Sequence, residues 1–389
     1  MGMTSRPLGL YVHFPFCKRK CSYCAFLSIP LDAPVRDYTD AVIHELESFV
    51  SEEEVLTAVG NRKLASVYFG GGTPSLWPAG HLERILNVAR KSLGLDSSCE
   101  VSIEVNPGTA DARALQEYRK IGINRISIGV QSLDDSFLRL LGRLHDSTQA
   151  KESVRFAENA GFQDISIDLM FGLPGQTPAM FEKDLQAVAS LGCTHLSLYE
   201  LTLESGTPLR RRVEQGEVAG LPDDDIVASM LDIADTRLSA LGFDRYEVSN
   251  LAKEGKECRH NSLYWSGGDY LAAGPAGVTL LYMEAGRAVR WTNTREIPDY
   301  MSRGRKAGTK EVLGPRDITR EGLLTGLRFK KGIDLKDLAK RAGVDPLAGA
   351  MDRIRMLEVE GFLTLKGDVL APTRLGMNLA DRLALELSP

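Results

Sequence analysis

The sequence predicts an α/β protein in which six βα units form an open or partial barrel, followed by a smaller α+β domain. Three observations support this prediction. Short β-rich runs alternate with helix-period segments from residue 8 to residue 200, the alternation stops near residue 215, and the chain ends in several helices around one hairpin. Alternating strands and helices are typical of a parallel sheet with helices outside it. Six units are too few for a complete eight-fold barrel.

The predicted strands are short runs rich in β-branched and aromatic residues. They are Leu8–Phe14, Ser66–Phe69, Glu100–Glu104, Arg125–Gly129, Asp164–Met170 and His195–Tyr199. The segments between them have helical periodicity. In residues 81–94, for example, apolar side chains from Leu82 to Leu93 fall on one face, and Gly94 is placed to end the helix.

Beyond the alternating region, Pro222 and the aspartates that follow it predict the start of a helix that ends before Gly242. From Thr319 the pattern predicts three helices, a hairpin that turns at residues 366–368, and a last helix, an order that resembles a winged helix. Residues 319–389 carry 12 Lys/Arg against 10 Asp/Glu without a basic stripe. We therefore expect this region to pack or to bind a protein partner, not nucleic acid. The expected domains are 1–240 and 241–389.

Composition narrows the class of protein. The chain has 389 residues, of which 43% are hydrophobic and 25% charged, with a formal net charge of -5. This charge does not favour binding to nucleic acid or to an anionic membrane. No apolar run has transmembrane length, and the N-terminus lacks the apolar segment of a signal peptide. The expected location is the cytoplasm, where six cysteines do not indicate disulfides.

Three of the cysteines are clustered. Cys17, Cys21 and Cys24 lie within eight positions, with three cations between the first two. His13 would be needed to complete a zinc site, but it lies outside the usual ligand spacing, and no second Cys-x-x-Cys follows. Iron–sulfur clusters usually take four thiolates, so three would leave one iron open to an external ligand. The cations Lys18–Lys20 fit this hypothesis because nearby positive charge lowers a thiol pKa.

Polar or glycine-rich residues follow every predicted strand. In a parallel barrel the carboxyl ends of the strands form one rim, where sites are built from several strands. A binding or catalytic site is therefore expected at this rim. The residues concerned are the cysteine loop, Gly70–Pro74, Glu104, Gln131, Asp168, Glu200 and Thr202.

The Cys-x3-Cys-x2-Cys spacing, with an aromatic residue before the third cysteine, resembles the radical S-adenosylmethionine superfamily. The GGGTP stretch at residues 70–74 and the six βα units are similar to the same superfamily. The resemblance implies a radical SAM barrel with a [4Fe-4S] cluster on Cys17, Cys21 and Cys24. It also implies that the open iron binds the amino and carboxylate groups of S-adenosylmethionine. Glycine permits the backbone to approach such a ligand closely.

A closer resemblance, over nearly the whole chain, is to the coproporphyrinogen III oxidase-like group. It rests on motifs in the same order: YVHFPFC, FGGGTPS, IEVNPG, SIGVQSLDDSFLRLLGRLHD, IDLMFGLPGQ, LSLYELTLESGTPL, RYEVSN, HNSLYW and DYLAAGP. The resemblance implies two sets of ligand contacts. The residues expected to contact the cluster-bound S-adenosylmethionine are Tyr11, Gly71, Glu104 and Asp168. Those that match a second such site in the oxidase branch are Tyr23, Gly72, Thr73, Gln131, Arg143 and Thr202.

The group contains oxidases and heme chaperones, and three features favour the chaperone branch. The oxidase branch has a further cysteine two positions after the third, where this chain has Phe26. It also has an N-terminal extension, whereas the first strand here starts by Leu8. Residues 260–265 fit the HNxxYW signature of the chaperone branch. The resemblance thus implies a protein that binds heme and transfers it to an acceptor such as a respiratory enzyme, and it does not favour coproporphyrinogen III oxidation.

Within the signature, His260 is the expected heme ligand because neutral imidazole is a common axial ligand of heme iron. Tyr264 and Trp265 would supply flat apolar surface for a porphyrin. Cys258 is the alternative ligand, whereas Cys99 and Cys193 are expected to be small buried side chains. The sequence leaves a homodimer open.

Overall fold

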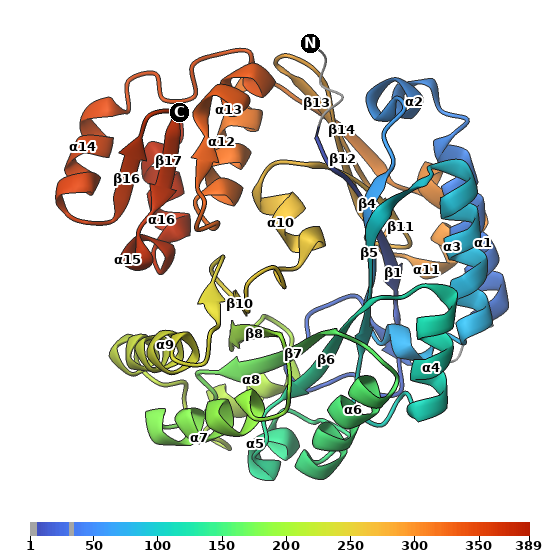
Figure 1. Ribbon diagram of the computed structural model, residues 1–389, viewed down its shortest axis with the longest axis vertical. Helices are drawn as coiled ribbons and strands as arrows, with labels where there is room; N and C mark the ends of the chain where they lie inside the picture. Colours follow the sequence, from blue (N-terminus) through green and yellow to red (C-terminus); the bar gives the residue numbers. More distant parts are fainter. Residues whose placement is uncertain (1–5, 31–34) are drawn as a thin grey trace.

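The fold is an open, curved sheet wrapped by helices, as the computed structural model in Figure 1 shows; it describes residues 6–30 and 35–389. All six predicted strands are confirmed, and each pairs in parallel with the next. They are β1 (Leu8–Phe14), β4 (Leu64–Gly71), β5 (Leu95–Val105), β6 (Arg125–Gln131), β7 (Asp164–Phe171) and β8 (His195–Glu200). The short strands β2 (Phe16–Cys17) and β3 (Ile29–Pro30) pair separately after β1.

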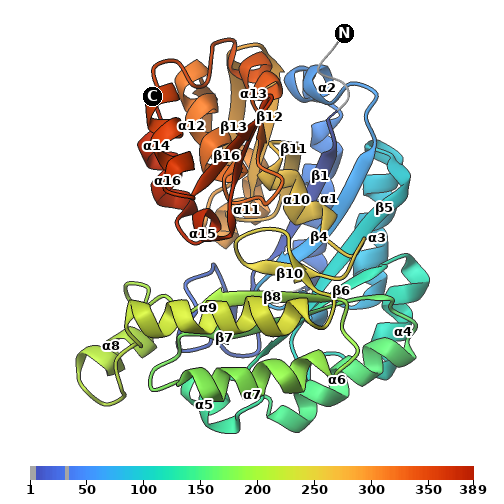
Figure 2. The ribbon, with the colours of Figure 1, turned by 60° about the vertical axis from the view of Figure 1, so that its left-hand side comes forward.

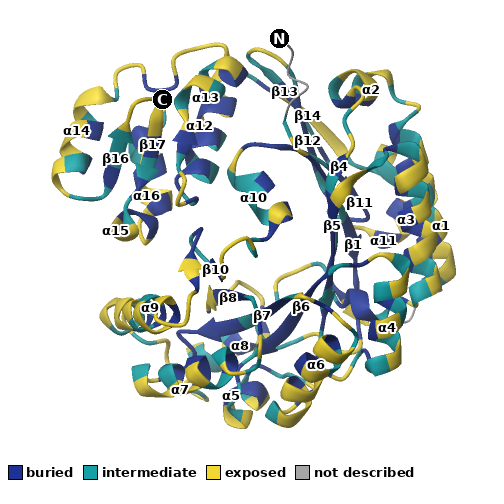
Figure 3. Ribbon diagram, viewed as in Figure 1, coloured by how far each residue is buried: buried dark blue, intermediate teal, exposed yellow. Residues whose placement is uncertain are grey.

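Helices cover the outer face of this sheet (Figures 1 and 2). The longer ones are α1 (Val35–Phe49), α3 (Ala79–Ser92), α4 (Ala112–Ile121), α6 (Ser147–Asn159), α7 (Pro178–Ala189) and α9 (Asp224–Ser239). Shorter ones are α2 (Glu53–Val59), η2 (Pro74–Leu76), α5 (Asp135–Leu140) and α8 (Pro208–Glu214). Helix α3 buries the predicted face, and Gly94 follows it with a φ of 69°. Asp223 caps α9 by accepting a bond from the Ile226 amide. Figure 3 shows the strands buried and the outer helix surfaces exposed.

The same sheet continues beyond the six units at both ends. At one end, β11 (Asp269–Ala273) pairs in parallel with the free side of β1, and three antiparallel strands follow it. These are β12 (Val278–Glu284), β13 (Arg287–Thr292) and β14 (Thr309–Leu313). At the other end, β10 (Asn250–Ala252) and β9 (Asp244–Arg245) extend β8. The two end strands do not pair with each other in the described residues, so the barrel is open, as predicted.

The C-terminal residues form a smaller unit around a second apolar core, which includes Leu323, Leu338, Ile354 and Leu370 and also side chains from β12, β13 and β14. Its elements are α12 (Pro315–Gly326), α13 (Leu335–Ala342), α14 (Met351–Val359), β16 (Leu363–Lys366), β17 (Val369–Pro372), α15 (Arg374–Met377) and α16 (Ala380–Leu387). The predicted order of three helices and a hairpin is confirmed, but two short helices, α15 and α16, stand where one last helix was expected. In addition, β15 (Ile333–Asp334) adds a third strand beside β17. The domain boundary at residue 240 stays a prediction, since the large sheet continues past it.

Three further elements pack against these two parts. Helix α10 (Arg259–Trp265) lies inside the curve of the sheet and contacts β1, β4 and α12 (Figures 1 and 2). Helix α11 (Ile297–Arg303) and the turn η3 (Gly304–Ala307) pack against α1. No helix in the described residues is both long enough and apolar enough to cross a membrane.

A buried ion pair fixes β11 beside β1. The Arg62 guanidinium lies 2.5 Å from the Asp269 carboxylate, and both side chains are almost fully buried. Asp269 also accepts a hydrogen bond of 2.7 Å from the Tyr282 amide in β12. The pair therefore joins the segment before β4 to the strands from the C-terminal half of the chain.

Replacing Asp269 by asparagine should be strongly destabilising, because it removes the negative charge that neutralises the buried Arg62 guanidinium. We expect the free energy of unfolding to fall by about 3 kcal/mol or more. Chemical denaturation followed by circular dichroism would measure it. The exposed Arg84–Asp40 pair is the matched control, since Asp40→Asn should cost less than about 1 kcal/mol. Equal losses for the two variants would contradict this role for the buried pair.

Candidate functional site

The three clustered cysteines lie on a loop at the rim formed by the carboxyl ends of the strands. Cys17 ends β2 and is buried, whereas Cys21 and Cys24 are half-buried, and all three are free thiols. Ser22, between them, fastens the loop to the far side of the barrel: its amide donates to the Leu141 carbonyl at 3.1 Å, and its carbonyl accepts from the Leu209 amide at 2.8 Å. The loop is thus held in place by backbone bonds to the ends of α5 and α8.

The cations between the cysteines have a structural role that the sequence did not indicate. Lys18, Arg19 and Lys20 are exposed and donate to backbone carbonyls, with Arg19 reaching the Gly142 carbonyl at 2.8 Å. Burial raises the pKa of Cys17 and of Cys24, and Lys20 offsets only part of the rise at Cys24. The expected lowering of a thiol pKa by these cations therefore acts at Cys24, through Lys20, where burial outweighs it, and all three cations also anchor the loop.

The glycines after β4 let the GGGTP turn lie directly against the cysteine loop. Gly71 has a φ of 118°, and a Cβ there would lie 2.6 Å from the His13 ring. A Cβ on Gly72 would lie 2.7 Å from the Phe16 carbonyl oxygen and 3.0 Å from Cys17 Sγ. The Gly72 amide instead donates to the Phe14 carbonyl at 2.7 Å. These positions require glycine for the contact between the two loops, independently of any bound ligand.

A chain of hydrogen bonds joins two of the thiols across the rim. Thr73 Oγ1 donates to Cys17 Sγ at 3.3 Å and accepts from Asn106 Nδ2 at 2.9 Å. Arg143 Nη2 donates to Asn106 Oδ1 at 2.5 Å, and its Nη1 donates to Cys21 Sγ at 3.5 Å. The expected residues Thr73 and Arg143 are thus brought together with the cysteines. Asn106, which joins them, was not singled out as a site residue, although it lies in the quoted IEVNPG motif.

Glu104, at the end of β5, is held at the centre of the rim. Its carboxylate accepts from the Gly71 amide at 3.1 Å and from the Tyr68 hydroxyl at 3.0 Å. Burial, and then the nearby charge of Asp168, raise the pKa of Glu104 to about 7. Asp168 accepts from Ser127 Oγ at 2.9 Å, and burial raises its pKa too. Glu104 and Asp168 therefore form the acidic interior of the rim, as expected for residues that contact a cationic ligand.

Tyr11 lies between this rim and the floor of the barrel. Its hydroxyl is 3.0 Å from His13 Nδ1, while His13 Nε2 is 3.2 Å from the Leu27 carbonyl oxygen. Both nitrogens of His13 are therefore engaged away from the thiols, which argues against the zinc alternative. In addition, no three His, Cys, Asp or Glu side chains of the described residues lie close enough to share one metal ion.

The remaining expected rim residues differ in how closely they join the site. Gln131 has a φ of 69°, a strained conformation for a residue with a side chain, and an added Cβ on Gly129 would lie 3.0 Å from its Nε2. Tyr23 interacts with Arg143, and burial raises its pKa. Thr202 is exposed in the loop after β8. Gln131 and Tyr23 thus border the bonded chain, whereas no side-chain contact joins Thr202 to it in the described part of the structure.

His260 lies on α10, below the rim. The imidazole is buried: Nδ1 is 2.9 Å from Ser66 Oγ, and Nε2 is 2.8 Å from the Tyr264 hydroxyl. The ring stacks on Tyr68 with centroids 5.1 Å apart. Burial lowers the pKa of His260 to about 3, so the ring is neutral at neutral pH. Both nitrogens are occupied, so an iron ligand at Nε2 would have to displace the Tyr264 hydroxyl.

The neighbours of His260 also have structural partners. Cys258 is buried, its thiol donates to Glu100 Oε1 at 3.5 Å, and burial raises its pKa to about 12. Trp265 packs with Tyr246 and with Phe329 of the C-terminal unit. Trp265, one of the two aromatic residues expected to contact a porphyrin, therefore already packs between α10 and the C-terminal unit.

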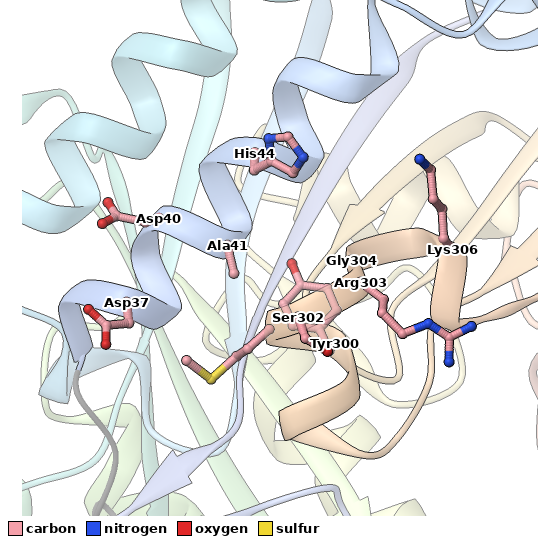
Figure 4. Close-up of a pocket in the computed structure, with 10 residues that line it drawn as sticks. Asp37, Asp40, Ala41, His44, Tyr300, Ser302, Arg303, Gly304 and Lys306 are labelled. Carbon is pink, nitrogen blue, oxygen red and sulfur yellow. The ribbon is translucent and has the colours of Figure 1, made fainter.

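A separate surface pocket of about 740 Å³ lies between α1 and α11–η3. Figure 4 shows Asp37, Asp40 and His44 on one side and Arg303 and Lys306 on the other. None of the expected site residues lines it. The pocket is outside the helical layer, and the candidate site remains the rim and the barrel interior.

Comparisons with known proteins show which family the chain belongs to. The model of the Radical SAM superfamily matches residues 11–188, and that of the HemN C-terminal domain matches residues 313–379. The chain is 36% identical over 297 residues to the heme chaperone HemW of Escherichia coli, covering 76% of each chain. It is 34% identical over 395 residues to that of Mycobacterium tuberculosis, covering 97% of this chain and 94% of the other.

The chain belongs to the HemW family of radical SAM proteins. A mitochondrial radical S-adenosyl methionine domain-containing protein 1 from Danio rerio is also similar, at 34% identity over 96% of this chain and 85% of the other. Among solved structures, coproporphyrinogen III oxidase (HemN) from Escherichia coli matches with a TM-score of 0.82 over 98% of this chain and 90% of the other. The two sequences are 22% identical, so this match supports a shared fold and nothing further. The expected radical SAM barrel is confirmed.

The radical SAM fold implies a [4Fe-4S] cluster and S-adenosylmethionine, and the residues at the rim fit both. Each thiolate of a four-iron cluster binds a different iron, so the thiols need not converge on one point. Such a cluster supplies an open iron that the amino and carboxylate groups of S-adenosylmethionine can chelate. In this chain Cys17, Cys21 and Cys24 would hold the cluster, and the carboxyl groups of Glu104 and Asp168 would face the cationic ligand.

Anaerobic reconstitution should give about four irons and four sulfides per chain. Replacing Cys17, Cys21 or Cys24 by alanine should abolish this, because each would remove one of only three ligands. Cys99→Ala and Cys193→Ala are the matched controls, since both thiols are buried in the apolar core. Iron and sulfide analysis is the measurement. One zinc without sulfide in the native protein would contradict the cluster.

The raised pKa of Glu104 predicts a pH effect on stability. Between about pH 4.5, the ordinary value, and about pH 7, the folded protein holds a proton that the unfolded chain has lost. The Glu104 contribution to stability is therefore present at low pH and is lost as pH rises to about 7. In the cluster-free protein, Glu104→Gln should flatten this part of the curve of unfolding free energy against pH. An unchanged curve would show that Glu104 titrates normally.

Proposed function

We propose that this protein binds heme and transfers it to an acceptor protein, and that it carries the cluster and S-adenosylmethionine as it does so. One observation carries the proposal: the chain is 34–36% identical to several proteins named heme chaperone HemW, over 76–97% of its length. The acceptor we propose is a heme-dependent protein such as a respiratory enzyme. Homodimerisation remains a prediction from the sequence.

The alternative is the oxidation of coproporphyrinogen III. Its support is the likeness of fold to HemN, which at 22% identity says nothing about chemistry. The position of the extra oxidase cysteine is occupied by Phe26, whose side chain is 72% exposed beside the cysteine loop and offers no thiol. We therefore expect no conversion of coproporphyrinogen III under anaerobic reducing conditions with S-adenosylmethionine. Turnover in that assay would move the protein to the enzyme branch.

His260 is the heme ligand that we propose. Its neutral ring is the form that binds iron, and it lies on the helix that contains the HNxxYW signature. Since Nε2 is bonded to the Tyr264 hydroxyl, ligation requires Tyr264 to turn away. Heme binding at this residue would therefore open the packing between α10 and β11, where Tyr264 also contacts Tyr270.

Titration of the reconstituted protein with hemin should give a saturable Soret change at about one heme per chain. His260→Ala should weaken binding by roughly tenfold or more and change the Soret position, because the axial bond is lost. Tyr264→Phe should keep the spectrum and bind at least as tightly, because it frees Nε2. His145→Ala is the matched control, since that histidine is also buried, bonds through Nε2 to the Val130 carbonyl and lies outside the barrel pocket.

Two results of this titration would contradict the proposal. An unchanged affinity and spectrum in His260→Ala would overturn the ligand assignment and direct attention to Cys258. The absence of saturable hemin binding by the wild-type protein would overturn the proposed function.

A further inference from the structure

A small polar pocket lies inside the barrel, between the strands β5–β8 and α10. Its lining includes Ser102, Arg125, Ser166, Ser197 and Asn261, and its volume is about 10 Å³, which is room for one oxygen atom. Arg125 is the first residue of β6 and pairs with Ser102 of β5. The pocket therefore extends toward the amino end of the strands, on the side of the barrel away from the cysteine loop.

Two polar groups that line this pocket have no hydrogen-bond partner among the described residues. They are Arg125 Nη2 and Ser102 Oγ, in side chains that are only 3% and 1% exposed. Arg125 uses its other terminal nitrogen, Nη1, to donate to the Lys256 carbonyl at 3.1 Å. Leaving a buried donor unpaired is costly. Nearly all buried polar groups in proteins have a partner, so this pair requires an explanation.

The nearby acids do not supply that partner. The carboxylate of Glu100 accepts from the Cys258 thiol and from the backbone amides of Arg259 and His260. Asp164 is bonded to Lys256 at 2.5 Å. These acids stabilise the guanidinium charge at a distance, but Nη2 remains free to donate to an acceptor in the pocket.

The pocket also has an approach for a ligand. Tyr68 and Tyr199 line it, and Tyr199 is 43% exposed. Tyr68 at the same time bonds to Glu104 in the rim. A ligand that lies against these tyrosines, below the rim, would have the two unpaired donors beneath it.

We propose that this pocket accepts a carboxylate oxygen of the ligand held in the barrel. The inference rests on the proposed function, because heme carries two propionate carboxylates and the pocket offers a guanidinium and a hydroxyl. A charged acceptor makes a stronger bond to a guanidinium than water does. Arg125 and Ser102 would then orient the bound porphyrin by one of its acidic edges.

The test compares hemin with its dimethyl ester, which has the same ring and iron but no carboxylates. Cluster-loaded wild-type protein should bind hemin roughly tenfold more tightly than the ester. Arg125→Gln keeps a donor for the Lys256 carbonyl but removes the charge, and it should bring the two affinities to about the same value. Ser102→Ala, which removes only an unpaired hydroxyl, should reduce the preference by roughly threefold.

The control is Arg245→Gln. Arg245 is a buried arginine whose partners are Val248, Asn378 and Asp235, all outside the pocket. It should lower stability and leave the preference unchanged. If wild type binds hemin and ester equally, or if Arg125→Gln and Ser102→Ala keep the full preference, the pocket holds only water and the inference is overturned while the proposed function stands. If wild type binds neither compound, the proposed function fails, and this inference with it.

Discussion

The contact between the GGGTP turn and the cysteine loop is the constraint on which the rim depends. The Gly72 amide bonds to the Phe14 carbonyl, and a side chain on Gly72 would collide with Phe16 and Cys17. Because the turn lies so close, Thr73 reaches Cys17 and the Gly71 amide reaches Glu104. The residues of four strands thereby form one bonded structure, and a small change in the turn would displace the thiols, the acid and Arg143 together.

Much of the fold could be predicted because its signals are local. The parallel strands follow from runs of β-forming residues between amphipathic helices, and the last hairpin follows from its turn at Lys366–Asp368. The place of β11 beside β1 could not be predicted in this way, since no local pattern says which distant strands pair. The two-residue strand β15 was also missed, because so short a run has no periodicity.

In the candidate site, too, local patterns could be predicted and contacts between distant residues could not. The cysteine spacing and the glycine turn are sequence patterns, the strand ends indicated Glu104 and Asp168, and the resemblance to a known group supplied Arg143. The partners of individual side chains depend on tertiary packing, so the anchoring role of Lys18, Arg19 and Lys20 and the bridging role of Asn106 became visible only in the structure. The same is true of His260, whose two nitrogens are bonded by residues 194 positions before and four after it.

The position of β1 between β4 and β11 has a consequence for how the chain folds during synthesis. Residues 8–14 leave the ribosome long before residues 269–273, and until then one edge of this strand has no partner. At rates of synthesis of about 5–20 residues per second, that edge waits for some tens of seconds. An unpaired strand edge invites pairing with other chains. The nascent barrel is therefore most exposed to aggregation during this interval, and the arrival of β11 ends it.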